Sequence, residues 1–283
     1  MIHTLSFIAQ SFTTNVPPYV ILGIASAFLS NSAFLKCWIS EFCGTFLMIL
    51  LTFSPGKWIG VDSLPVAWLS HAAGVILSDY IGGGPHVNPA VSLAMFSLGK
   101  SSYTETYIRI SGAMTGGLIA FPILLYFSES MKWEPLGGPT YSPTDENDNF
   151  AAAFFNEFLA FFCLLFIIFL VNFEMHFGKH HYIVKQSLTA AGVRYLIQVF
   201  GLTGPAMNPM LGTSWAVFDS DRAAFPEVSE HYLIYWIAPA LGALAGSFLY
   251  AIYAGENFFG MSLPAGPIKN VKEVKHDDNK KTK

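Results

Sequence analysis

The sequence predicts an all-α membrane protein in which six transmembrane helices and two re-entrant half-helices form an inverted repeat. Three observations predict this fold: the composition, a repeated Asn-Pro motif, and two glutamates at matching positions. Of the 283 residues, 53% are hydrophobic and 12% are charged, whereas a soluble protein has about 25% charged residues. The apolar residues fall in long blocks, so we expect a polytopic membrane protein, and the length suits one domain with six or seven spans.

The motif Gly-Pro-x-x-Asn-Pro occurs twice, at residues 84–89 and 204–209. Asn is a good N-cap and Pro suits the first helical position, so helices should begin at Pro89 and Pro209. Ending near Leu98 and Phe218, each would be about 15 Å long, half the thickness of the hydrocarbon core. Two ordinary caps in unrelated loops are the alternative. The matching flanks favour half-helices that meet at the midplane through Asn88, Pro89, Ala90, Asn208, Pro209 and Met210.

The other apolar blocks predict the six long helices, near residues 38–53, 65–81, 107–127, 150–173, 186–202 and 232–254. They form repeat one, about 36–127, and repeat two, about 150–254, within a domain of residues 36–268. Three spans per half is an odd number, which inverts the second half and places the site at the repeat interface. Residues 1–35 hold a short apolar helix, which is compatible with an interfacial helix, an extra span or a lead-in to the next helix. A charged tail covers residues 269–283.

Each half carries a glutamate early in its first span, Glu41 and Glu157, and each is followed by Phe. Carboxylates inside a membrane mark functional sites by default. They either support the structure around the half-helices or carry protons in a transporter. Each half also ends in a span with two glycines four residues apart, which lets helix backbones approach closely in lipid: Gly112 and Gly116, Gly242 and Gly246.

The half-helices point their positive dipole ends at the membrane centre, which opposes cations and protons. With the Asn88 and Asn208 side-chain oxygens occupied as caps, their amide N–H groups can donate to a passing solute. The sequence therefore predicts a passive pore for small neutral solutes. A proton-coupled transporter using Glu41 and Glu157, and a non-conducting structural membrane protein, are the alternatives.

Several function classes find no support in the sequence. Cys37, Cys43 and Cys163 have no framework spacing, so we expect no disulfide scaffold, metal site or cofactor. No basic face suggests nucleic acid, and the N-terminus lacks the basic segment of a cleaved signal peptide. The spacing of His176, His180 and His181 is similar to that of membrane di-iron hydroxylases, but the other histidines are scattered singly. We therefore expect no enzyme.

Paired Asn-Pro motifs in inverted three-span halves, each with Glu-Phe in its first helix, resemble the aquaporins over roughly Trp38 to Ala254. Asn88-Pro89-Ala90 has the family's usual form, whereas Asn208-Pro209-Met210 departs at its third residue. Leu211 stands where orthodox aquaporins carry Arg. These departures and the extra N-terminal segment look most like the intracellular super-aquaporin branch.

The resemblance implies a homotetramer in the lipid bilayer with one pore per subunit. It implies an outer selectivity filter of Trp68, Leu196, Pro205 and Leu211, an uncharged constriction that fits water, glycerol or hydrogen peroxide. It also implies that Glu41, Glu157 and His86 brace the loops before the half-helices. Arg194 lies two residues before Leu196, about 200° around a helix, so we expect it not to line the same pore wall.

Lysine and arginine set the expected orientation and location. Lys100, Arg109, Lys179, Lys185 and the tail lysines fall in one set of loops, which the positive-inside rule places in the cytosol. Lys280 and Lys281 resemble a dilysine signal that returns membrane proteins to the endoplasmic reticulum, an address that needs a cytosolic tail. The plasma membrane is the alternative location.

Overall fold

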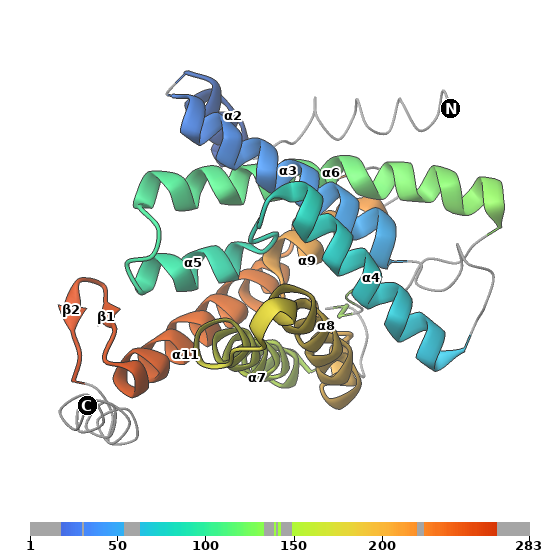
Figure 1. Cartoon of the computed structure of the whole chain (residues 1–283). Coiled ribbons are helices and arrows are strands. Elements are labelled where there is room, and N and C mark those ends of the chain that lie inside the picture. The colour runs from blue at the N-terminus through green and yellow to red at the C-terminus, as the bar shows by residue number, and fades with distance from the viewer. Residues whose placement is uncertain are drawn as a thin grey trace.

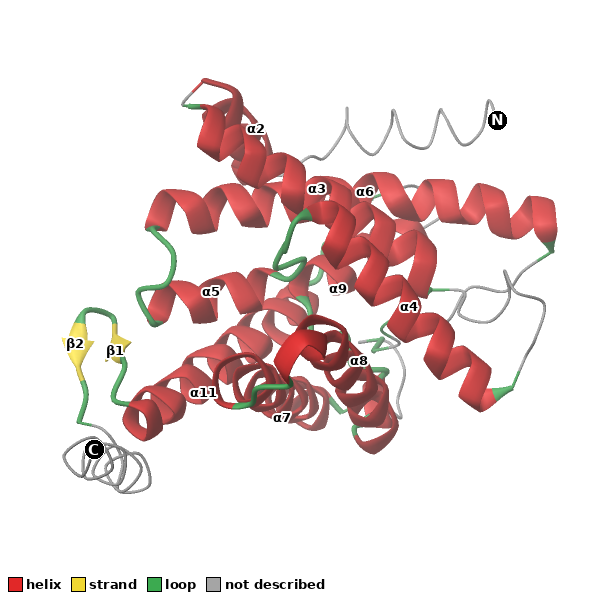
Figure 2. Ribbon diagram, viewed as in Figure 1, coloured by secondary structure: helices red, strands yellow, loops and turns green. Residues whose placement is uncertain are grey.

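The computed structural model describes residues 18–29, 31–53, 63–132, 139, 141–142, 149–219 and 224–264. The predicted charged tail, with Lys280 and Lys281, lies outside these residues, as does the segment 1–17. Within the described residues the chain is almost entirely helical (Figure 2). Loops join the helices, and one short antiparallel hairpin follows the last helix, in which Asn257 pairs with Ser262.

The first half contains one short helix, three long helices and a half-helix. In order these are α2 (Pro18–Leu29), α3 (Ser32–Thr52), α4 (Leu64–Gly82), α5 (Pro89–Ser97) and α6 (Tyr103–Met131). α3 begins where Asn31 accepts hydrogen bonds from the backbone N–H groups of Ala33 and Phe34. α4 ends at Gly83, whose positive φ of 77° suits a glycine.

The second half repeats this order with more irregular turns. Its helices are α7 (Phe150–Phe169) with the π-turn η2 (Leu170–Glu174), the 3-10 turn η3 (Gly178–His180), α8 (His181–Val199), the 3-10 turn η4 (Gly201–Thr203), α9 (Pro209–Asp219), α10 (Ser229–Tyr232) with the π-turn η5 (Leu233–Ile237), and α11 (Ala238–Ala254). The hairpin strands β1 (Asn257–Phe258) and β2 (Met261–Ser262) follow.

Among the residues that the structure describes, four helical segments are both long and apolar enough to cross a membrane: Ser32–Thr52, Tyr103–Met131, Phe150–Glu174 and Ser229–Ala254. α4 and α8 have 19 residues each, about 28 Å, and are not among these four segments. Their polar side chains include His71 and Asp79 on α4, and Lys185 and Arg194 on α8. The site described below explains this polarity, because these side chains line an internal cavity.

The N-terminal apolar segment contains the short helix α2. It has 12 residues, about 18 Å, which is too short to cross a core of about 30 Å by itself. It packs along α6 and α3, where the Ser111 hydroxyl on α6 donates to the carbonyl oxygen of Val20 over 2.9 Å. α2 is therefore a short helix docked on the outside of the first half.

Each half contains a close helix crossing of the same kind. A Cβ on Gly116 of α6 would lie 2.7 Å from the carbonyl oxygen of Phe42 on α3, and one on Gly242 of α11 would lie 2.7 Å from that of Phe158 on α7. Phe42 and Phe158 directly follow the two glutamates. Gly116 therefore corresponds to Gly242 in the repeat, and both need to lack a side chain.

The bundle has two ends that differ in composition. At the hairpin end, the Phe259 backbone N–H donates to the carbonyl oxygen of Ser97 (2.7 Å), and Lys100 pairs with Glu256 at 3.4 Å. The aromatic end is formed by rings 4.9 to 5.7 Å apart from α3, α6 and α9: Phe53, Phe121, Trp215 and Phe218. α5 runs from the middle of the bundle toward the hairpin end, and α9 belongs to the aromatic end (Figure 1).

Candidate functional site

Both half-helices begin at the predicted Asn-Pro motifs. The Asn88 side-chain oxygen accepts a hydrogen bond from the Ala90 backbone N–H (2.9 Å), and the Asn208 oxygen accepts one from Met210 (3.0 Å). Pro89 and Pro209 occupy the first helical positions and are buried. The sequence therefore builds the two helix starts in the same way, from a cap and a proline.

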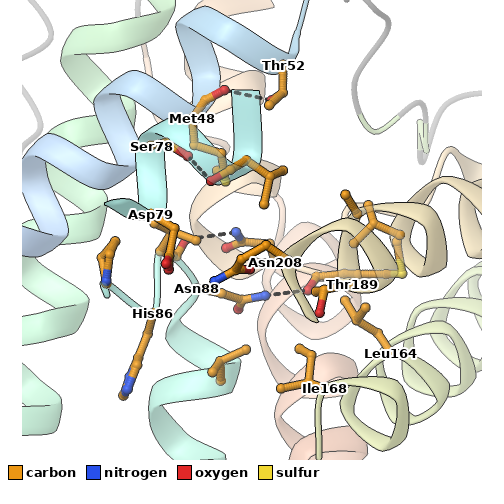
Figure 3. A pocket seen from close by; sticks show the side chains of 18 of the residues that line it. Met48, Thr52, Ser78, Asp79, His86, Asn88, Leu164, Ile168, Thr189 and Asn208 are labelled. Atoms are coloured by element: carbon orange, nitrogen blue, oxygen red, sulfur yellow. Dashed lines mark hydrogen bonds between the residues drawn. The ribbon is translucent and has the colours of Figure 1, made fainter. Parts of the chain in front are cut away.

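The two caps are also bonded to each other's loops. The Asn88 side-chain amide donates to the carbonyl oxygen of Met207 (2.8 Å), and the Asn208 amide donates to that of Val87 (3.0 Å). Val87 and Met207 both have positive φ, 50° and 48°, which is unusual for these residue types. We expected the amides to be free for solutes, but each spends one of its two N–H donors on the opposite loop (Figure 3).

The glutamates lie behind these loops. Glu41 accepts hydrogen bonds from the backbone N–H groups of His86 (2.7 Å) and Val87 (2.8 Å). Glu157 accepts those of Ala206 (2.5 Å) and Met207 (2.9 Å). Both carboxylates are fully buried. Each therefore satisfies two backbone donors that would otherwise be buried without partners.

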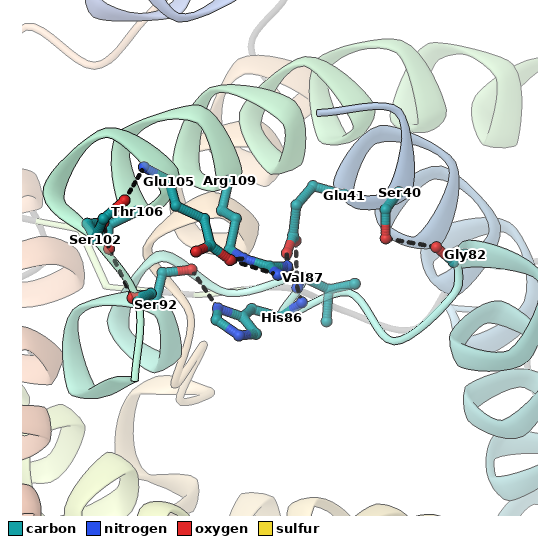
Figure 4. A network of polar contacts seen from close by, with 11 residues as sticks. Ser40, Glu41, Gly82, His86, Val87, Ser92, Ser102, Glu105, Thr106 and Arg109 are labelled. Carbon is teal, nitrogen blue, oxygen red and sulfur yellow. Dashed lines mark hydrogen bonds and ion pairs between the residues drawn. The ribbon is translucent and has the colours of Figure 1, made fainter. Parts of the chain in front are cut away.

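The first loop has a polar network that the sequence did not predict (Figure 4). Arg109 lies within α6, rather than in a loop as expected, and donates to Glu41 at 2.6 Å and to Glu105 at 2.9 Å. Nδ1 of His86 lies 3.0 Å from the Ser92 hydroxyl on α5. His86 therefore lies beside the half-helix α5.

One cavity of about 810 Å³ runs past both motifs. Asn88 and Asn208 line its middle, together with the loops before them, including Gly84 and Gly204. Met95 and Phe173 line it toward the hairpin end, and Phe53 and Pro139 line it toward the aromatic end. Neither Glu41 nor Glu157 is among the residues that line it.

The structure brings only two of the four expected filter residues to this cavity. Pro205 and Leu211 line it. Trp68 is 44% exposed, and the residues of α4 that line the wall begin at His71, one turn further along. Leu196 is buried in the core between α8 and α7, because its face of α8 includes Gly192, which packs against Ile167. Counting back from the Asn-Pro motifs therefore selected the wrong side chains on these two helices.

The expectation for Arg194 is also wrong. Arg194 lines the cavity, together with Val193 and Ile197. The spacing argument correctly placed Arg194 and Leu196 on different sides of α8 but assigned the wrong side to the pore. The polar residues of α8 that line the cavity include Lys185, Gln186, Thr189 and Arg194. They spread over about half of the helix circumference, so they do not identify the side of α8 that faces the pore.

The clustered histidines and the three cysteines lie outside this cavity. The rings of His176 and His181 stack with centroids 5.2 Å apart, near the hairpin end of α8. Cys37, Cys43 and Cys163 are free thiols. Among the residues that the structure describes, no group of three or more His, Cys, Asp or Glu side chains is placed to hold a metal ion.

Comparison with known proteins places the chain in a family. The model of the family described as Major intrinsic protein matches residues 28–250. Similar proteins include an aquaglyceroporin of Plasmodium berghei (25% identity, 78% of this chain and 89% of that protein) and human Aquaporin-9 (27%, 78% and 83%).

Among solved structures, the X-ray structure of the aquaglyceroporin from Plasmodium falciparum has the same fold, with a TM-score of 0.62, 19% sequence identity, and coverage of 77% of this chain and 95% of that chain. The predicted fold class is confirmed by this likeness and by the family match. The chain belongs to the major intrinsic protein family, the aquaporins.

Proposed function

We propose that this protein is a passive channel for water and small neutral solutes such as glycerol. The observation that carries the proposal is the cavity between Asn88 and Asn208, because it is lined by residues from both ends of the bundle. Two of the similar proteins are named aquaglyceroporin and Glycerol uptake facilitator protein-like 6, which supports glycerol as a solute. The family consists of membrane channels, so we expect transport and no catalysis.

The chemistry of the cavity wall suits a polyol. One N–H of each asparagine amide remains available at the midplane, where a solute hydroxyl can exchange water hydrogen bonds for protein ones. Val91, Ile197 and Leu211 supply apolar surface beside these donors. Glycerol has hydroxyls on one side and carbon on the other, so it matches a wall that is polar and apolar in turn. The positive ends of α5 and α9 oppose cations and protons at the same level.

The structure favours a channel over a proton-coupled transporter. Both oxygens of Glu41 and of Glu157 accept backbone hydrogen bonds, and neither side chain lines the cavity. Protonation of either carboxylate would weaken the loop that it supports without reaching a solute. We therefore assign both glutamates to support of the loops.

The experiment is stopped-flow light scattering on proteoliposomes with water, glycerol and hydrogen peroxide gradients, with and without a proton gradient. We expect glycerol and water flux above that of empty liposomes and independent of the proton gradient. Asn208→Ala should lower the flux while the protein still inserts. Asn156→Ala is the matched control, since Asn156 bonds to the Phe200 carbonyl oxygen (2.8 Å) outside the cavity. Solute accumulation against its gradient would favour the transporter.

We propose a homotetramer on the strength of the family resemblance. Apolar side chains on the outer faces of α4 and α8 are exposed and available for lipid or for a neighbouring subunit, among them Leu69, Leu77 and Tyr195. Native mass spectrometry from detergent would report the subunit number. A monomer that conducts solute would show that the assembly is not needed for the pore.

The endoplasmic reticulum, the super-aquaporin branch and the cytosolic C-terminus stay predictions from the sequence. The location depends on Lys280 and Lys281, which lie outside the described residues. Replacing both lysines by Ser in a protein tagged at its N-terminus, and imaging it in cells, tests the signal. A double variant that stays reticular like the parent would show that the lysines are not the address.

A further inference from the structure

Arg194 brings a permanent positive charge into the cavity. It lies four residues after Ala190 and three before Ile197, and all three line the cavity, as expected for one face of a helix. Its Nε atom is buried without a hydrogen-bond partner, and no acidic partner is found within the described part of the chain. Because a guanidinium is always charged, and unpaired charge inside a membrane is costly, this side chain needs a functional explanation.

His71 lies on the facing helix. It lines the same cavity from α4, and α4 packs against α8. Both of its ring nitrogens are buried, and the ring lies close to the Thr52 backbone and within electrostatic range of the Arg194 guanidinium. Two polar side chains from different helices therefore line one part of the cavity.

This part of the cavity lies between the asparagine pair and the aromatic end. Arg194 is five residues before the end of α8, and His71 is in the first half of α4. Thr52 and Phe53 at the end of α3 line the same region, and so does Leu211 on α9. A solute here has a cation and an imidazole on one side and apolar surface from Phe53 and Leu211 on the other.

We propose that Arg194, supplied from α8, is the specificity-determining residue of this channel, with His71 as its partner across the cavity. The guanidinium donates hydrogen bonds to the hydroxyl or carbonyl oxygens of neutral solutes such as glycerol and urea, and its charge repels cations and protons. The second half-helix carries Leu211 at the position of the family's usual arginine, so the charge enters from a different wall. This inference rests on the proposed channel function and corrects the expected uncharged filter.

The two roles of Arg194 can be separated by substitution. Lys keeps the charge but lacks the planar fork of five donors that can bind two acceptor oxygens at once. Leu removes both the charge and the donors. Leu211→Arg combined with Arg194→Leu returns a guanidinium to the same cavity from α9. Tyr195→Leu is the matched control, because Tyr195 adjoins Arg194 in sequence, is 63% exposed and does not line the cavity.

The experiment measures glycerol, water and proton flux in proteoliposomes of the full chain, with a pH-sensitive dye reporting protons under a potassium–valinomycin clamp. We expect Arg194→Leu to raise proton leak about tenfold or more, because it removes a unit charge that repels cations inside the cavity. Arg194→Lys should keep the leak low and lower the ratio of glycerol to water flux about threefold through the lost hydrogen bond. The double variant should return the leak toward the parent value, and Tyr195→Leu should match the parent.

Unchanged proton leak and glycerol flux in Arg194→Leu, in a parent that conducts glycerol, would overturn this inference and leave the channel standing. A double variant that leaks as much as Arg194→Leu would also overturn it, because the charge in the cavity would then not be the barrier. A parent with no flux of water or glycerol would overturn the proposed channel and this inference together.

Discussion

The loop before α5 and the loop before α9 are built alike in backbone and differ in charge. Each has a residue of positive φ, an Asn cap and a buried glutamate that accepts two backbone N–H groups. Glu41 also pairs with Arg109 at 2.6 Å, whereas Glu157 has no ion pair within the described part of the chain. Ser92 binds His86 beside the first loop, and Gly212 stands at the matching place after Asn208.

The difference shows that a buried glutamate can hold the second loop through two backbone N–H donors, without the ion pair that Glu41 has. The second loop depends more on packing, since Met207 and Met210 are almost fully buried and a Cβ on Gly212 would lie 2.8 Å from Cβ of Tyr235. The first loop depends more on charge, and its network ties α3 to α6 through Glu41 and Arg109. Matching substitutions in the two halves should therefore change the melting temperature unequally where a charged group is removed. They should change it equally where only backbone contacts are affected.

The largest effect should come from removing the glutamates. Glu41→Ala and Glu157→Ala each leave two buried N–H groups without an acceptor, at about 1–3 kcal/mol per group. Glu41→Ala also removes one of the two carboxylates that pair with the partly buried Arg109. It should therefore lower the melting temperature in detergent more than Glu157→Ala. Thermal unfolding followed by size-exclusion chromatography measures both. Equal shifts in melting temperature would show that Arg109 does not contribute to the stability of the first half.

Arg109→Met should come next, because breaking a buried ion pair costs about 3–5 kcal/mol. Glu41 keeps its two backbone donors in this variant, so the loss should be smaller than for Glu41→Ala. Combining Arg109→Met with Glu41→Gln removes the uncompensated charge and should recover part of the melting temperature. A double variant that loses the sum of the two single losses would mean that the two side chains are not coupled.

The glycine pair should give equal effects in the two halves. Gly116→Ala and Gly242→Ala each force a methyl group to 2.7 Å from a backbone carbonyl oxygen, and such overpacking costs about 1–3 kcal/mol. Melting temperatures should fall by similar amounts in both variants. Gly83→Ala offers a contrast in the same assay, since space is open there and only the positive φ of 77° opposes it. Unequal shifts in the first two variants would show that the repeat is not symmetric at this crossing.

The smallest effect should be that of Ser92→Ala, which removes the hydrogen bond to His86 and should cost about 1 kcal/mol. The first loop keeps Glu41, Arg109 and the Asn88 cap, so glycerol flux should stay close to that of the parent. Flux and melting temperature measured on the same preparation would test this. A large loss of flux would give His86 a role beyond the support of the loop.

The sequence predicted what depends on local chemistry. The caps at Asn88 and Asn208 and the starts at Pro89 and Pro209 follow from the preferences of single residues, and the repeat of Glu41 and Glu157 reveals the inverted symmetry. The family match and the structural neighbour confirm the resulting fold class. Arg109 was assigned to a loop, because a charge at the start of an apolar block looks like a boundary until its partner on another helix is known.

The sequence could not decide which face of α4 and α8 turns to the pore. Helical spacing separates Arg194 from Leu196, but packing of Gly192 and Leu196 against α7 determines which side is internal. Trp68 was selected by counting residues back from Asn88, but the residues of α4 that line the wall begin at His71. The polar residues of α8 could not settle the question, because Leu196 lies seven residues after Thr189 and projects from nearly the same side of the helix.

The central claim is that solute passes through the cavity between the two half-helices, and the most direct measurement is block by a thiol reagent at one residue of its wall. In a background with Cys37, Cys43 and Cys163 replaced by Ala, Thr189→Cys places a thiol on the wall, and Leu188→Cys places one on the outer surface of the same helix. With labelling of both verified by mass spectrometry, the account predicts that the reagent abolishes glycerol flux in Thr189→Cys and leaves it unchanged in Leu188→Cys. Equal flux in the two labelled variants would contradict it.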